Sequence, residues 1–297
     1  MLFFNIVKKY ILILLLLFMI KTAYAENIYY KGVEIPSNNS AIFVPPSQKI
    51  IITVKECNKK IVTNWISSKK EGNYSVTING ITKTFKTTAI VGVSSNKIKD
   101  GYINDFYLGK YPTPNVPYKH LYKIPSFFYK ITENNSELHI SNEWTIKELA
   151  IDKTESLPQY IAFDYNLLQK LVEIKNELKK RNKPNNMYFI GGMFISPYNN
   201  IKRYENGKGM VASVSRHLYG DAVDFIIDEN NDNEMDDLND DGTVDYLDAR
   251  YLEKLVTSLE NNHKCKIGGF VVYAPPLNDH VTVHVDTRGY RARWEFK

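Results

Sequence analysis

The most informative segment of this 297-residue chain is Ser215-Arg216-His217-Leu218-Tyr219-Gly220-Asp221-Ala222-Val223-Asp224, and a second one, Val283-His284-Val285-Asp286, follows near the C-terminus. His217 and His284 carry imidazoles and Asp224 a carboxylate, which are groups that bind zinc in proteins. Catalytic zinc typically has three protein ligands and keeps a fourth position for water, whereas structural zinc is usually closed by four ligands rich in cysteine. Because the chain has no Cys-x-x-Cys pair, we predict an open zinc site held by His217, Asp224 and His284.

The two segments also have local patterns that suit such a site. Gly220 permits a tight turn after His217, and the run Val223-Asp224-Phe225-Ile226-Ile227 is typical of a buried strand. In the second segment, polar residues recur at every second position and would face one side of a strand. We predict that this strand forms one wall of the site with His280, Thr282, His284 and Asp286.

Three motifs in the C-terminal half occur together. They are His217-x-x-Gly220-x-Ala222-x-Asp224, then His284-x-Asp286-Thr287, and the tail Arg288-Gly289-Tyr290-Arg291-Ala292-Arg293-Trp294. Through them the chain from about Ile140 to Lys297 resembles the zinc D-alanyl-D-alanine carboxypeptidase and murein endopeptidase family, whose fold group includes lysostaphin and hedgehog proteins. The resemblance implies an α+β zinc metallopeptidase domain at residues 131–297, with an antiparallel sheet and flanking helices. It also implies a hydrolase whose partners are peptidoglycan stem peptides or their cross-links.

One position of this chain differs from the family. The matching turn there commonly reads Ser-Gly-aromatic-Arg-Thr-Pro, and its Arg binds a substrate carboxylate or developing negative charge. Aligned through Ser196-Pro197-Tyr198, that position holds Ile195 in this chain. Arg203 or Arg216 could replace the arginine in a carboxypeptidase, whereas an endopeptidase needs it less. We keep both alternatives and expect Arg216 and Tyr198 to contact substrate.

The general base is not assigned by the motif. Some relatives place Asp-His-x-His at the third ligand, with a base three residues before it, but Val281 has that place in this chain. His280 and Asp286 are the first candidates because they share the predicted face with His284, and Asp279 is the next. His280 could orient water or stabilise an oxyanion, while Asp286 could instead hold a zinc ligand in place.

An acidic insertion at residues 228–248 follows the first zinc motif. From Asp237 it has the spacing of a calcium loop, with Gly242 at the turn and Asp248 in place of the usual bidentate Glu, as in dockerin-like loops. Closely spaced carboxylates repel one another without a counter-ion, so we favour structural calcium over a solvated acidic loop. The predicted ligands are Asp237, Asn239, Asp241, the Thr243 carbonyl, Asp245 and Asp248.

The N-terminal residues have the features of a secretory signal. Lys8 and Lys9 precede the short apolar run Ile11–Ile20, and Ala23-Tyr24-Ala25 suits cleavage before Glu26. We therefore predict a signal peptide at residues 1–25, no stable membrane anchor after its removal, and export to the periplasm or cell envelope or beyond it. An uncleaved anchor is the alternative. The charge of +5 falls when the signal is removed, so nucleic acid binding is not indicated.

Residues 26–130 predict a small all-β, sandwich-like accessory domain. Short β-branched and aromatic runs alternate with turn signals, and Asn79-Gly80 between two such runs indicates a hairpin. Farther along, residues 165–181 and 249–259 have helical apolar spacing, and Asp164 is placed to cap the first of these helices. Cys57 and Cys265 either form a disulfide, which export permits, or stay free.

Two classes of function remain open at this stage. The first is an exported zinc metallopeptidase of D-Ala-D-Ala carboxypeptidase or murein endopeptidase type. The second is a non-catalytic cell-wall-binding protein that retains the zinc fold, which the unassigned base and Ile195 would fit. All three zinc ligand types are present at His217, Asp224 and His284, and this favours the enzyme.

Overall fold

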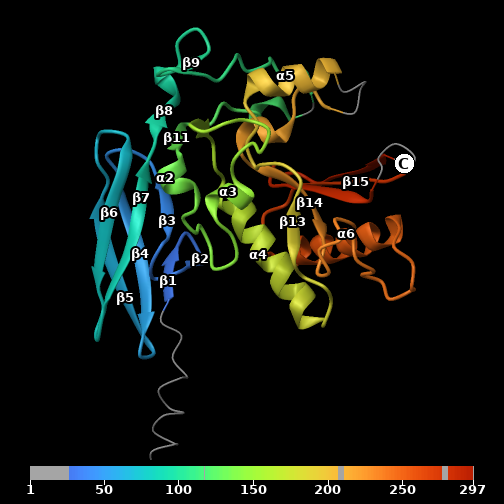
Figure 1. The fold of residues 1–297 in the computed structure, drawn as a ribbon, viewed down its shortest axis with the longest axis horizontal. Coiled ribbons are helices and arrows are strands. Elements are labelled where there is room, and N and C mark those ends of the chain that lie inside the picture. Colours follow the sequence, from blue (N-terminus) through green and yellow to red (C-terminus); the bar gives the residue numbers. More distant parts are fainter. Residues whose placement is uncertain (1–26, 117, 207–210, 276–279, 297) are drawn as a thin grey trace, which may run out of the picture.

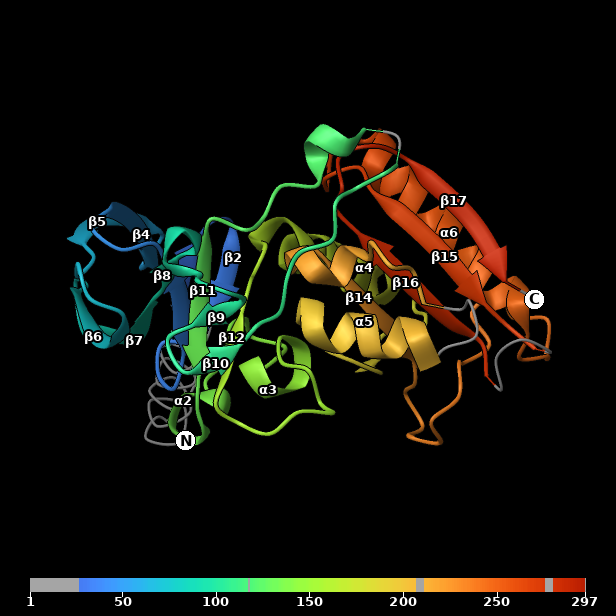
Figure 2. The same ribbon diagram turned by 90° about the horizontal axis from the view of Figure 1, so that it is seen from above.

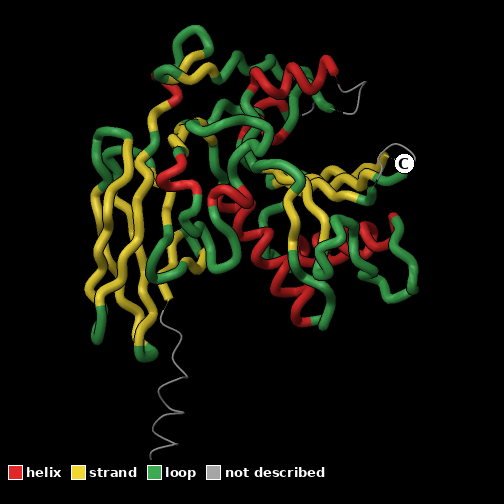
Figure 3. Tube along the Cα trace, viewed as in Figure 1, coloured by secondary structure: helices red, strands yellow, loops and turns green. Residues whose placement is uncertain are grey.

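The computed structural model describes residues 27–116, 118–206, 211–275 and 280–296 and has a mixed α+β architecture with several sheets (Figure 1). The predicted signal peptide and Asp279 lie outside the described residues. Within the described ranges, no helix combines the length and apolar character that crossing a membrane requires. The strands gather in two groups, with helices and loops between them (Figure 3).

The elements have the following bounds. The strands are β1 (Asn27–Tyr30), β2 (Val33–Ile35), β3 (Ala41–Val44), β4 (Lys49–Glu56), β5 (Lys59–Ile66), β6 (Gly72–Asn79), β7 (Thr84–Val91), β8 (Val93–Ser94), β9 (Tyr102–Ile103), β10 (Phe106–Tyr107), β11 (Phe127–Ile131), β12 (Gln159–Ile161), β13 (Met187–Phe189), β14 (Ala222–Ile227), β15 (Gly269–Tyr273), β16 (Thr282–Asp286) and β17 (Ala292–Phe296). The helices are α2 (Glu133–Ser136), α3 (Ile146–Leu149), α4 (Tyr165–Lys180), α5 (Pro197–Asn206) and α6 (Tyr246–Asn261), with 3-10 turns η1 (Ser95–Lys97), η2 (Lys119–Leu121) and η3 (Arg216–Tyr219).

The N-terminal strands form two sheets, in the orders β2-β1-β4-β5 and β3-β7-β6. In β4, buried and exposed side chains alternate, so that one face contributes Ile50, Ile52 and Val54 to the core. The predicted hairpin around Asn79-Gly80 is confirmed, because β6 pairs antiparallel with β7. The core continues from these strands into the rest of the chain.

The C-terminal group of strands is a five-stranded sheet in the order β13-β14-β16-β15-β17. Figure 2 labels the strands β14, β16, β15 and β17 of this sheet. The sequence predicts an antiparallel sheet, but the pair β15 and β17 is parallel. The reason is the short connection after β16. It passes the end of β15 at Gly268, where an added Cβ would overlap the carbonyl oxygen of Asp286, and β17 then runs back along the far side of β15.

Helices α4 and α6 contact each other, and α6 also packs against β15. The predicted first helix is confirmed as α4, which Asp164 caps by accepting a hydrogen bond from the Asn166 N–H. The second helix is longer than predicted, because Asp245 caps it and α6 begins at Tyr246. Apolar side chains cover the helix-facing side of the sheet, among them Val223, Phe225, Phe270, Val283 and Val285.

A buried ion pair joins these layers. The Nζ of Lys170 on α4 lies 2.8 Å from Glu260 Oε1 on α6 and donates to the carbonyl of Asp286, at the end of β16, over 2.9 Å. Both charged side chains are fully buried, and Glu260, which also pairs with Arg293 at 2.6 Å, offsets the lost hydration of Lys170. Cys57 and Cys265 are free thiols, which is the second of the two alternatives that the sequence left open.

Candidate metal centre

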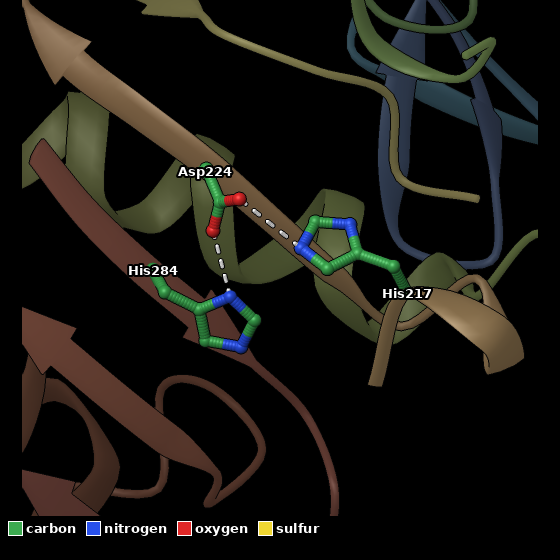
Figure 4. Close-up of side chains that lie close together, drawn as sticks. All are labelled: His217, Asp224 and His284. Atoms are coloured by element: carbon green, nitrogen blue, oxygen red, sulfur yellow. Dashed lines mark hydrogen bonds and ion pairs between the residues drawn. The ribbon is translucent and has the colours of Figure 1, made fainter. Parts of the chain in front are cut away.

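The three predicted zinc ligands lie together. His217 comes from η3, Asp224 from β14 and His284 from β16, and one potential ligand atom of each lies within 4.8 Å of the others (Figure 4). Of the His, Cys, Asp and Glu side chains in the described residues, these three lie close enough together to hold a metal ion. Asp224 lies between the two rings, 2.7 Å from Nδ1 of His284 and 3.4 Å from Nε2 of His217.

Two local features set this arrangement. Asp224 and His284 are direct partners in the β14–β16 register, so the sheet itself places their side chains side by side. His217 reaches them because the chain turns at Gly220, which has a left-handed φ of 65° and where an added Cβ would overlap the carbonyl of Ala162. The tight turn that the sequence predicts at Gly220 is therefore confirmed.

The ring of His217 is oriented for a metal. Its Nδ1 lies 3.0 Å from the carbonyl oxygen of Gly192 and donates to it, so in the neutral ring the lone pair is on Nε2, which faces Asp224. Nε2 is buried and, in the described part of the chain, has no hydrogen-bond partner. A buried imidazole nitrogen without a partner is costly, and a bound cation would satisfy it, so these residues fit a metal ion.

Asp286 lies behind His284. Its Oδ2 is 3.3 Å from His284 Nε2, its Oδ1 accepts from the Gly269 N–H over 2.7 Å, and Arg288 binds both oxygens. The side chain is fully buried. These contacts place Asp286 as a partner that orients His284 rather than as a group that reaches a substrate.

The charges of the three ligands are strongly coupled. Burial opposes the ionised form of Asp224, but His217 and His284 outweigh it and hold the pKa of that carboxyl well below its usual range. Burial likewise opposes the charged form of His284, but its hydrogen bonds to Asp224 and Asp286 raise its pKa to about 9. In the metal-free protein at neutral pH, His284 therefore holds a proton that a metal ion has to displace.

The trio lies in the wall of a cleft of about 710 Å³. His280 lines the cleft near its surface, and its Nδ1 lies 3.6 Å from Glu234. Apolar and aromatic side chains make up much of the remaining wall. They are Tyr122, Tyr188, Ile190, Ile195, Val211, Ala212, Val214, Ile226, Val271, Tyr273 and Trp294.

The two predicted substrate contacts differ in position. Arg216 lines the cleft, but it is paired with Asp221 and stacked on the rings of Tyr122 and Tyr219, with its guanidinium carbon 4.7 and 4.6 Å from their centroids. Tyr198 is not among the lining residues. Its N–H donates to the Leu108 carbonyl, and its ring packs on Tyr107 instead.

The sequence did not predict a role for Tyr122, which lies in the proline- and tyrosine-rich segment before the proposed peptidase part. That segment reaches across to β16 and β17 (Figure 2). Arg216 donates to the Leu121 carbonyl, and the Tyr122 hydroxyl lies 3.1 Å from that of Tyr290. Burial raises the pKa of Tyr122 to about 12, so it stays a neutral hydroxyl. The signal that could have indicated this contact is the tyrosine content of the segment.

In the predicted calcium loop, the carboxylates accept hydrogen bonds from backbone N–H groups of the loop itself. Asp237 accepts from the N–H groups of Asp240 and Gly242, and Asp241 accepts from Thr243. Asp248 is buried and accepts from three backbone N–H groups that lead into α6, those of Leu238, Asn239 and Asp245. Within the described residues these carboxylates are not gathered as closely as the His217 group. Calcium binding here stays a prediction.

No protein-family model matches this chain, and no curated protein or solved structure is significantly similar to it. Fold and site together define an α+β protein with a buried two-histidine, one-aspartate group in the wall of a cleft.

Proposed function

We propose that this protein is an exported zinc-dependent peptidase that hydrolyses peptidoglycan stem peptides or their cross-links. The observation that carries the proposal is the buried group of His217, Asp224 and His284 in the wall of a cleft of about 710 Å³. That volume is within the range of roughly 300–1,000 Å³ that is usual for ligand sites. The motif resemblance to the zinc D-alanyl-D-alanine carboxypeptidase and murein endopeptidase family supports the choice of substrate.

The donor set supports zinc as the metal. Two imidazole nitrogens and one carboxylate oxygen are ligands that zinc accepts, and three protein ligands leave a position for water. Zinc, when bound, would supply a Lewis acid for the scissile carbonyl and would lower the pKa of a water molecule. Gly192 and Asp286 would keep His217 and His284 in the orientation that this requires.

Among the candidates for the general base that lie within the described residues, His280 is the one that remains. It lines the cleft and its side chain is 56% exposed, whereas Asp286 is buried behind His284. An exposed imidazole beside Glu234 can accept a proton from water and pass it to a leaving amine. The third candidate, Asp279, lies outside the described residues.

A non-catalytic cell-wall-binding protein is the second candidate function. It is favoured by Ile195, where the resembled family has a substrate-binding arginine, and by the pairing of Arg216 with Asp221. These two features leave fewer charged groups for catalysis. They do not affect the metal ligands, and for this reason we rank the enzyme first.

The deciding experiment incubates the purified protein with muropeptides after chelation, with and without added zinc, and identifies products by mass spectrometry. We expect zinc-dependent products that are lost in His217→Ala. The exposed turn residue His263 provides a matched control, because His263→Asn removes a histidine away from the site. Stoichiometric zinc binding without any product would reject the peptidase and favour the binding protein.

A further inference from the structure

We infer that the substrate is a chain that crosses the strands of the five-stranded sheet, so that the reacting bond is internal and uncharged segments flank it on both sides. This inference rests on the proposed peptidase function and specifies its substrate. It follows from three features of the cleft, namely the position of the metal group, the character of the two flanking surfaces, and the pairing of every arginine that lines it.

The metal group lies in the middle of the sheet face. Asp224, His284, Val271 and Trp294 are direct partners on β14, β16, β15 and β17, so they form one row across the sheet. On the opposite side of Asp224, Ile190 donates its N–H to the Asp224 carbonyl and continues the row past β13. Residues therefore extend from the ligands in both directions.

Apolar surface flanks the ligands on each side. Beyond Asp224 lie Tyr188, Ile190 and Ile226, and Tyr188 is 47% exposed. Beyond His284 lie Val271 and Trp294, and Trp294 is 38% exposed. Five strands at about 4.8 Å spacing span about 19 Å, which matches five or six residues of an extended chain at roughly 3.3 Å each. A substrate of that length would place residues on both sides of the metal.

The arginines of the cleft already have carboxylate partners. Arg203 binds both oxygens of Asp152 at 2.7 and 2.8 Å, Arg216 pairs with Asp221, and Arg288 pairs with Asp286. The described residues that line the cleft include no lysine.

Away from the metal ligands, a substrate carboxylate would have to compete for a paired arginine or stay without a counter-ion among the described lining residues, and both are costly. The two flanking surfaces therefore suit uncharged segments, and the described lining holds no unpaired arginine that would fix a terminal carboxylate one residue away from the reacting bond.

A comparison of substrates tests whether the protein cuts an internal bond or releases a terminal residue. The zinc-loaded protein is given a cross-linked muropeptide dimer and a monomer with a free C-terminal D-Ala-D-Ala, each also with its terminal carboxylate amidated. We expect the internal cross-link to be cut at least tenfold faster than the terminal residue is released, and amidation to change kcat/KM by less than about threefold. Terminal release that is faster and is lost on amidation would overturn the inference.

Two variants test whether both surfaces bind the chain. Tyr188→Ala and Trp294→Ala each remove an exposed ring from one side of the metal group, and each should lower kcat/KM for the dimer about tenfold, the loss expected for one aromatic contact. Tyr102→Ala is the control, because Tyr102 is 48% exposed and lies outside the cleft lining.

Zinc stoichiometry should be unchanged in all three variants. A loss confined to one of the two cleft variants would overturn the inference while leaving the peptidase proposal intact. Failure to cleave any of the four substrates by the zinc-loaded wild-type protein would reject the peptidase function itself, and with it the inference.

Discussion

Asp286 provides the sharpest test of how the metal centre is built. Asp286→Asn keeps the shape of the side chain but removes the charge that faces His284 Nε2 at 3.3 Å and pairs with Arg288. Loss of a buried partner of a metal-ligating histidine typically costs 10–100-fold in metal affinity. We therefore expect the zinc dissociation constant to rise by that factor, which is about 1.4–2.8 kcal/mol of binding free energy.

The same substitution should also lower the stability of the metal-free protein. Arg288 and Asp286 are 9% and 0% exposed, so Asn would leave the guanidinium buried without its counter-charge. Breaking a buried pair on one side costs about 3 kcal/mol or more. Asp221→Asn is a matched control, because Asp221 is also buried and pairs with Arg216 but does not contact a ligand ring.

Two measurements separate these effects. Urea unfolding in the presence of a chelator gives the free energy of unfolding, and competition with a chromophoric chelator gives the zinc affinity. Both variants should lose stability, but only Asp286→Asn should bind zinc more weakly. An unchanged zinc affinity in Asp286→Asn, or an equal loss in Asp221→Asn, would refute the role that we assign to Asp286.

Three further outcomes are expected. The folded-state pKa of His284, about 9, lies above its ordinary value of 6.5, so the stability that this group contributes is complete below pH 6.5 and is lost as the pH rises through 9. Thermal unfolding with chelator should show a decrease of about 3 kcal/mol in the free energy of unfolding over this pH range. Excess zinc should abolish the decrease, because the metal ion replaces the proton. Lys170→Met should destabilise the protein in urea unfolding by less than the roughly 3 kcal/mol of an isolated buried pair, because Arg293 still pairs with the buried Glu260, whereas Glu260→Gln should cost more because it removes the carboxylate from both Lys170 and Arg293. If the loop from Asp237 binds calcium, Asp237→Asn should lower the melting temperature in calcium more than it lowers turnover per folded molecule, and a larger effect on turnover would contradict a structural role.

The features that the sequence predicts well depend on local patterns. Helix α4 follows from apolar spacing and the Asp164 cap, and the β6–β7 hairpin follows from Asn79-Gly80. The metal group could also be predicted from the sequence, because ligand types and strand alternation are local properties of the segments that hold His217 and His284. In each case a few neighbouring residues determine the outcome.

The features that the sequence missed depend on contacts between distant segments. Alternation places Asp286 on the same face as His284, but it does not reveal that Gly269 and Arg288 cover it. Tyr122 reaches the cleft from more than 90 residues before His217, and the tyrosine content of its segment does not by itself tell which surface the segment contacts. The parallel pairing of β17 likewise depends on where a short connection passes the sheet.

The three ligands are held by two different kinds of structure. Asp224 and His284 are paired by the strand register and supported from behind by the buried Lys170 network at the end of β16. His217 lies in a 3-10 turn whose residues are all buried. Its carbonyl accepts from the Ile195 N–H, and its ring Nδ1 lies 3.0 Å from the Gly192 carbonyl oxygen. Because these contacts join segments that are distant in the sequence, the three ligands come together only when the sheet and the η3 turn fold against each other.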